Sequence, residues 1–231
     1  MPAEPRANPS HLAAPGPADR LRQRLTEGTG RLAVIAAVCL VWLMDWLLVH
    51  RLESHQEIGA DVRALVTSVE ELASVVFVVV TLGLVVALVR GRRDALFRWA
   101  LAYLLFAVLQ VVCNVFSMVA TATNHQGEGL VGLWDVGAVY MQSVLVFMFV
   151  YVFLDVSTPG GAFVWPSREG EPPSTPHVVD YLFISLNVNS TYGPTSEALV
   201  SRTAKLVMSL QVLLAMVMLT VLIARAVSST S

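Results

Sequence analysis

Five long apolar runs constrain this 231-residue chain more than any other feature of its sequence. They cover residues 32–49, 72–89, 99–122, 136–154 and 206–224. A helix needs about 20 apolar residues to cross the hydrocarbon core of a membrane, and each run comes close to that length. The composition agrees, since 55% of the residues are hydrophobic, only 14% are charged, and the mean hydropathy is +0.66. The chain is predicted to be an integral membrane protein.

The predicted fold class is all-α, a bundle of about five transmembrane helices with one short re-entrant helix. Helices are favoured because a spanning segment must satisfy its own backbone hydrogen bonds in lipid. The sequence divides into a proline-rich, disordered tail, four transmembrane helices, a Pro/Gly-rich loop, a re-entrant half-helix with a polar loop, and a last transmembrane helix. In that order, these predicted segments are residues 1–30, 31–155, 156–177, 178–194 and 195–228.

The re-entrant helix is predicted from a short apolar stretch, residues 178–188, that a polar loop follows. Eleven residues are too few to cross a bilayer, and Asp180 is placed to cap the start of such a helix. Irregular backbone at membrane depth must be buried in protein or line a watery cavity, as it does in channel filters. The residues that would line a pore are Asn187, Asn189, Ser190, Thr191, Tyr192 and Gly193.

Charge predicts the orientation, because Lys and Arg gather on the cytoplasmic side of membrane proteins. With the N-terminus inside and the C-terminus outside, 12 of the 15 basic residues fall on the cytoplasmic side. The loop 155–205 then lies inside, whereas the pore loop of a tetrameric channel enters from outside. Three interpretations stay open: the re-entrant segment enters from the cytoplasm, the number of spans differs by one, or the segment is only a hydrophobic hairpin.

Polar side chains inside the predicted spans are the other candidate functional residues, because they are costly in lipid. They are Asp45, Gln110, Asn114, Gln142 and Gln211. Gln110 and Asn114, with Ser117 and Thr121, recur on one face of a helix, and that face is expected to point into the bundle. Two interpretations stay open, a polar pathway and hydrogen bonds that hold the helices together.

Several classes of function find no support in the sequence. It has no phosphate-binding loop, no nucleophile elbow and no zinc-protease motif, so we predict neither an enzyme nor a cofactor or metal site. Its two cysteines lie within apolar runs, and its net charge of −2 gives no indication of a nucleic-acid partner.

Two parts of the sequence resemble known families of membrane proteins. The segment 179–225 resembles the pore helix, filter and inner helix of potassium-channel-type proteins, although only Thr191-Tyr192-Gly193 of the filter pattern is present and Pro194 follows it. The strings DYLFISLNVNSTYGPTSEALVSRTAKLVMSLQVLLAMVMLTVLIARAV (180–227) and MQSVLVFMFVYVFLDV (141–156) are similar to a family of uncharacterised actinobacterial inner-membrane proteins, domain of unknown function thirteen forty-five. That resemblance implies a multi-pass protein of the plasma (inner) membrane.

The functional hypothesis from the sequence is a pore-loop, ion-channel-like or ion-permeation protein. Its expected partners are the lipid bilayer, further copies of the chain in a homo-oligomer, and monovalent cations. Two alternatives remain, a non-conducting membrane scaffold or accessory subunit, and a small transporter that uses Asp45 and the polar face of the third span.

Overall fold

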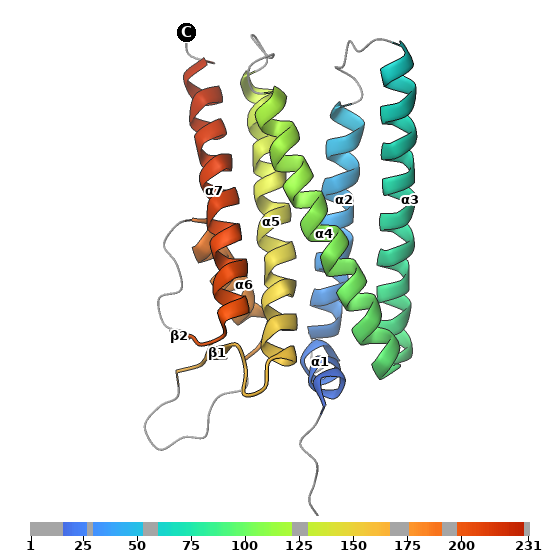
Figure 1. Cartoon of the computed structure of the whole chain (residues 1–231), viewed down its shortest axis with the longest axis vertical. Coiled ribbons are helices and arrows are strands. Elements are labelled where there is room, and N and C mark those ends of the chain that lie inside the picture. The colour runs from blue at the N-terminus through green and yellow to red at the C-terminus, as the bar shows by residue number, and fades with distance from the viewer. Residues whose placement is uncertain are drawn as a thin grey trace, which may run out of the picture.

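A computed structural model describes residues 16–26, 30–52, 60–121, 129–166, 176–190 and 198–228. Within these residues the chain forms seven helices and one pair of two-residue strands (Figure 1). Five helices are long: α2 (Gly30–Leu52), α3 (Ala60–Arg90), α4 (Arg93–Thr121), α5 (Gly129–Ser157) and α7 (Arg202–Ser228). Two are short: α1 (Pro17–Thr26) and α6 (Val178–Asn189). The prediction of an all-α fold is confirmed.

Three of the described helices are long and apolar enough to cross a membrane. They contain the spans Asp94–Val119 in α4, Trp134–Ser157 in α5 and Arg202–Val227 in α7. The other two long helices hold shorter apolar stretches, Val34–Leu48 in α2 and Ser74–Arg90 in α3. The structure therefore supports a membrane protein with three candidate spans.

Helix α5 forms the centre of the bundle and packs against α2, α4, α6 and α7. Of the residues in its most apolar part, 67% are buried, against 33% in α4 and in α7. Every residue of α5 from Gln142 to Val152 is buried. A helix that is apolar on all sides is typical of such a central position. Polar side chains on α5 can therefore meet partners from several helices.

Helix α1 corrects the prediction of a disordered tail over residues 1–30. Residues 17–26 form a helix that lies across one end of the bundle, at the opposite end from the C-terminus (Figure 1). Its Leu21 and Leu25 are 2% and 4% exposed, in a part of the molecule where α1 packs against α4 and α5. The prediction is wrong for residues 17–26, because two leucines four residues apart make an apolar stripe that can dock on the bundle. Residues 1–15 lie outside the described residues.

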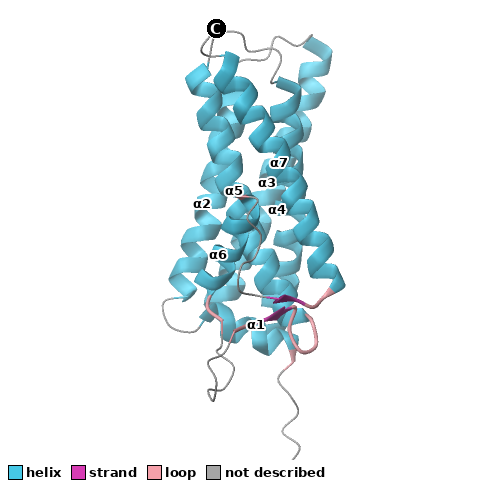
Figure 2. Ribbon diagram, turned by 90° about the vertical axis from the view of Figure 1, so that its left-hand side faces the viewer, coloured by secondary structure: helices cyan, strands magenta, loops and turns pink. Residues whose placement is uncertain are grey.

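Helix α6 reaches only part of the way along the bundle, in the half that carries α1 (Figures 1 and 2). Strands β1 (Phe163–Val164) and β2 (Ala198–Leu199) pair antiparallel, with Phe163 opposite Leu199. The chain before α6 and the chain after it therefore meet at the same end of the bundle. Asp180 accepts a hydrogen bond from the His177 N–H at 2.7 Å, which caps the start of α6 as the sequence predicts.

Candidate functional site

A buried carboxylate lies between three helices in the interior of the bundle. Asp45 of α2 is 5% exposed, and its Oδ1 accepts hydrogen bonds from amide groups on α4 and α5. The donors are Gln110 Nε2 at 2.8 Å, Gln142 Nε2 at 3.3 Å and Asn114 Nδ2 at 3.5 Å. We call these four residues the Asp45 cluster. The structure thus brings together four of the five polar residues that the sequence singles out within the spans.

The amides of the Asp45 cluster also hold one another. Asn114 Nδ2 donates to Gln142 Oε1 at 2.8 Å, so the carboxamide of Gln142 is turned with its Nε2 toward Asp45. Gln110 and Asn114 are four residues apart on α4, which places both on the face that meets α2 and α5. Gln142 is fully buried. Asn114 therefore acts as a positioning residue as well as a donor.

The chemistry of the Asp45 cluster differs from that of a metal centre. Three neutral N–H donors meet one carboxylate oxygen, an arrangement that stabilises negative charge on Asp45 where water is scarce. No group of three or more His, Cys, Asp or Glu side chains that could hold a metal ion is found among the described residues. The cluster is equipped to hold one negative charge on Asp45.

The fifth predicted residue, Gln211 of α7, belongs to a second cluster, which we call the α6 cluster. Gln211 Nε2 donates to Asn189 Oδ1 at 3.0 Å and to the Oγ and backbone oxygen of Ser185 at 3.0 and 3.1 Å. Gln211 Oε1 accepts the hydroxyl of Tyr151 from α5. Ser143 Oγ donates to Asn189 Oδ1 at 3.3 Å. These bonds tie α5, α6 and α7 together.

The residues predicted to line a pore are placed only in part. Asn189 is 4% exposed, and besides its bonds in the α6 cluster its Nδ2 donates to the Tyr140 backbone oxygen at 3.3 Å. Ser190 lies 3.0 Å from the hydroxyl of Tyr140. The Nδ2 of Asn187 is buried and has no hydrogen-bond partner. Thr191, Tyr192 and Gly193 lie outside the described residues.

Asn189 and Ser190 also border a cavity of about 360 Å³ between α5 and α7. Its other walls are mostly apolar and include Val136, Ala215 and Met218. The C-terminal end of α6 meets this cavity, and the last carbonyls of a helix carry partial negative charge. A cation or a hydrogen-bond donor is the chemistry that such an end favours.

Neighbouring positions on α5 join the two clusters into what we call the polar belt. Gln142 reaches the Asp45 cluster, whereas the next residue, Ser143, reaches the α6 cluster. Both lie near the middle of α5, so the two clusters meet at about half the length of this helix. The belt comprises side chains from five helices: Asp45, Gln110, Asn114, Gln142, Ser143, Tyr151, Ser185, Asn189 and Gln211.

Three members of the belt were not predicted from the sequence: Ser143, Tyr151 and Ser185. A signal existed for Ser185, because it precedes Asn189 by four residues and so shares its helix face. Ser143 stands beside Gln142 and could have indicated a second polar direction on α5. Tyr151 stands among apolar residues and carried no such signal.

A third polar contact fixes where α6 begins. Asp155, near the end of α5, accepts backbone N–H groups of Ala162 at 2.7 Å and Phe163 at 3.2 Å, and also the hydroxyl of Tyr181 from α6. The turn between them passes through Gly161, whose φ is +89° and where a Cβ would stand 3.0 Å from Asp155 Oδ1. This contact is structural, because every bond closes a loop or anchors α6.

No family model, curated protein or solved structure matches this chain. The resemblances to the domain-of-unknown-function family and to potassium-channel-type proteins therefore stay predictions.

Proposed function

We propose that the chain is a five-span membrane protein of the plasma (inner) membrane, in which α2 and α3 cross the membrane beside α4, α5 and α7. The arrangement in Figure 1 supports it, because the long helices run side by side. The end of the bundle that carries α1, the α3–α4 turn and the start of α7 also carries many arginines, and such an end faces the cytoplasm. The N-terminus is then inside, the C-terminus outside, and α6 enters from the cytoplasm.

We further propose that the protein is an ion-permeation protein that carries protons or a small monovalent cation, with Asp45 as the binding group. The observation that supports this most strongly is the meeting of three amide donors at Oδ1 of a carboxylate that is 5% exposed. An isolated charge at this depth is expensive, so an intramembrane carboxylate with built partners favours a functional interpretation. Uptake of a proton or a cation neutralises it.

In this proposal the two oxygens of the Asp45 carboxylate have different roles. Oδ1 is held by the three amides, and Oδ2 takes the proton or contacts the cation. On proton uptake the carboxylate becomes a neutral acid while Oδ1 keeps its donors, so the cost of charge burial falls without loss of the hydrogen bonds. Asp45 lies seven residues before the end of α2, roughly 10 Å at 1.5 Å per residue. Access to Asp45 is therefore shorter from the outer side.

A second candidate function is permeation beside α6, as the pore-loop hypothesis has it. The cavity of about 360 Å³ at the C-terminal end of α6 favours this candidate. Against it, the side-chain amide of Asn189 is hydrogen-bonded to Ser143, Gln211 and the backbone of Tyr140, so these groups are occupied by protein partners rather than facing a pathway. The geometry therefore supports Asp45 as the ion-binding group and α6 as a packed element.

Flux through purified protein in liposomes tests this proposal. Wild-type protein should dissipate an imposed proton or potassium gradient, and parallel assays with a pH-sensitive and a cation-sensitive dye identify the ion. Asp45→Asn keeps the size and one acceptor oxygen but removes the ionisable group, so flux should fall at least tenfold. The matched control is Asp94→Asn, the same change at an exposed carboxylate, which should leave flux unchanged.

Wild-type protein that moves neither ion would contradict the proposal and favour a non-conducting scaffold. Unchanged flux in Asp45→Asn would contradict the assignment of Asp45 while leaving permeation itself standing.

A further inference from the structure

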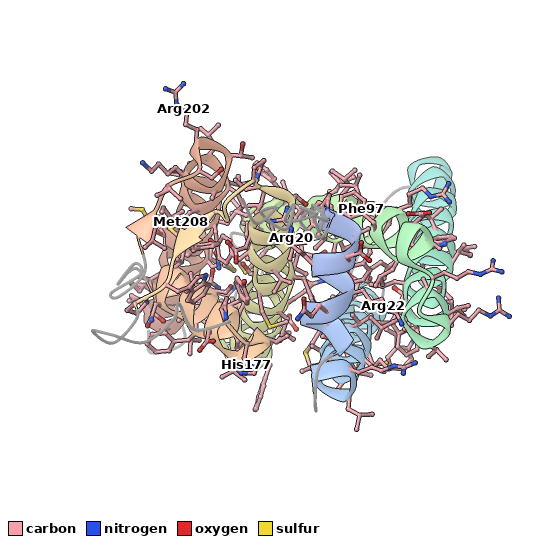
Figure 3. The ribbon with its side chains drawn as sticks, turned by 90° about the horizontal axis from the view of Figure 1, so that it is seen from below. Arg20, Arg22, Phe97, His177, Arg202 and Met208 are labelled. Atoms are coloured by element: carbon pink, nitrogen blue, oxygen red, sulfur yellow. The ribbon has the colours of Figure 1, made fainter. Side chains whose placement is uncertain are left out.

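Four arginines from three parts of the chain gather around the turn that joins α3 to α4. Arg90 and Arg92 flank Gly91 in this turn, and both are exposed. Arg31 of α2 donates from Nη2 to the backbone oxygen of Val89 at 2.8 Å. The guanidinium of Arg22, on α1, lies beside Gly91, where a Cβ would stand 3.5 Å from its Nη2. Figure 3 shows Arg22 near α4 when the bundle is viewed from this end.

At this end of the bundle the described arginines outnumber the described carboxylates. Asp155 and Asp180 are used elsewhere, in the bonds to Ala162 and His177. Asp19 and Asp94 are the other carboxylates described on α1 and at the start of α4. Like charges that are held close together repel one another and raise the affinity for an anion.

A groove begins at the same turn and runs along the outer surface between α3 and α4. It has a volume of about 400 Å³, and Arg90 and Arg92 are among its lining residues. Its apolar floor includes Val79, Leu82 and Val86, which are 53%, 58% and 44% exposed. From Val79 to Arg90 the helix rises by roughly 16 Å, at 1.5 Å per residue.

Trp99 closes one side of the groove and depends on Gly83 for its position. A Cβ on Gly83 would stand 2.4 Å from Cε3 of the Trp99 ring, so the indole packs directly against the backbone of α3. Tryptophan is typical of the level where the headgroups meet the acyl chains. The groove therefore joins a basic mouth, an aromatic wall and an apolar floor.

We propose that this groove binds one anionic phospholipid. The phosphate lies at Arg90 and Arg92, and an acyl chain runs along Val86, Leu82 and Val79 toward the middle of the membrane. Charge selects the lipid class, because basic pockets between transmembrane helices on the cytoplasmic side bind anionic headgroups. The apolar floor selects a lipid over a free phosphate ion, since only the lipid covers the exposed valine and leucine side chains.

Lipid retention by the purified full-length protein, measured by native mass spectrometry, tests the proposal. With phosphatidylglycerol and phosphatidylcholine supplied in equal amounts, the wild type should retain one phosphatidylglycerol. The double variant Arg90→Gln/Arg92→Gln should weaken its binding at least tenfold. The control is Arg202→Gln, which removes an exposed arginine on α7 far from the groove (Figure 3) and should change the binding less than twofold.

A second variant tests the groove independently of charge, and it keeps the proposal testable if the double variant does not fold. Val86→Trp places a large side chain on the groove floor from an exposed position, and it should also weaken phosphatidylglycerol binding. The proposal is overturned if the double variant binds as the wild type does, or if Arg202→Gln weakens binding equally, which would indicate a diffuse attraction. Full competition by inorganic phosphate would overturn the lipid assignment, because it would show that an anion alone occupies the site.

Discussion

Replacing Gln211 with leucine removes the residue that joins α5, α6 and α7. Leucine has nearly the volume of glutamine but no hydrogen-bonding group. Gln211 is fully buried, and its Nε2 and Oε1 bond to Asn189, Ser185 and Tyr151. The variant therefore tests how strongly these bonds hold the half-helix α6 in the bundle.

The expected loss follows from the bonds that break. A side-chain hydrogen bond between membrane helices contributes about 0.6 kcal/mol on average, and Gln211 makes such bonds to α5 and α6. The hydroxyl of Tyr151 loses its acceptor in a buried position, which adds about 1 kcal/mol. Asn189 Oδ1 keeps its bond from Ser143, so it adds little. Gln211→Leu should lower the free energy of unfolding by about 2 kcal/mol.

A double-mutant cycle with Tyr151→Phe separates the bond from general effects of substitution. Tyr151→Phe alone should cost about 1 kcal/mol, because it leaves Gln211 Oε1 without its donor. The double variant should be more stable than the sum of the two losses predicts, by about 1 kcal/mol. Equilibrium unfolding in detergent or by steric trapping in bicelles measures all four proteins. Losses that add within about 0.3 kcal/mol would refute the reasoning, because the bond would then contribute nothing.

Two further predictions concern packing. Leu21→Ala should lower the free energy of unfolding by about 2–3 kcal/mol, because it removes a buried contact between α1 and the bundle. Deletion of residues 1–15 should leave the unfolding midpoint unchanged. A Leu21→Ala protein as stable as the wild type would mean that α1 does not dock on the bundle. Gly83→Ala should cost about 1–3 kcal/mol, because the added Cβ meets Trp99 at 2.4 Å. Gly137→Ala, where a Cβ meets nothing within 4 Å, should be neutral or stabilising when equilibrium unfolding of both variants is measured. Equal effects of the two alanines would contradict the close packing of Trp99.

Periodicity and length predicted most of the fold. Apolar runs of membrane length located all five long helices, and the short run 178–188 located α6 almost to the residue. Helix α1 was missed because prolines dominate the region before it, whereas the signal for docking is only two leucines four residues apart. The pairing of β1 with β2 depends on residues 34 and 36 positions apart, and two-residue strands leave no local pattern to detect.

The sequence predicted most of the individual residues of the candidate site, but not which of them contact one another. Asp45 was predicted because a carboxylate within an apolar span is costly in lipid, and Gln110 and Asn114 were predicted because their helical spacing places them on one face. Nothing in a sequence states which helices are neighbours, so the meeting of that face with Asp45 and Gln142 required the fold. The same limit separated Gln211 from the other four, because its partner Tyr151 lies 60 residues away.

The most direct test of the account compares ion flux in two variants of the polar belt, Asp45→Asn and Gln211→Leu, at equal amounts of folded protein in liposomes. We assign ion binding to Asp45 and packing to Gln211. We expect Asp45→Asn to lose flux at least tenfold while its free energy of unfolding stays close to that of the wild type. Gln211→Leu should unfold more easily and keep its flux. Flux that survives in Asp45→Asn and disappears in folded Gln211→Leu would contradict the account and move the permeation path to α6.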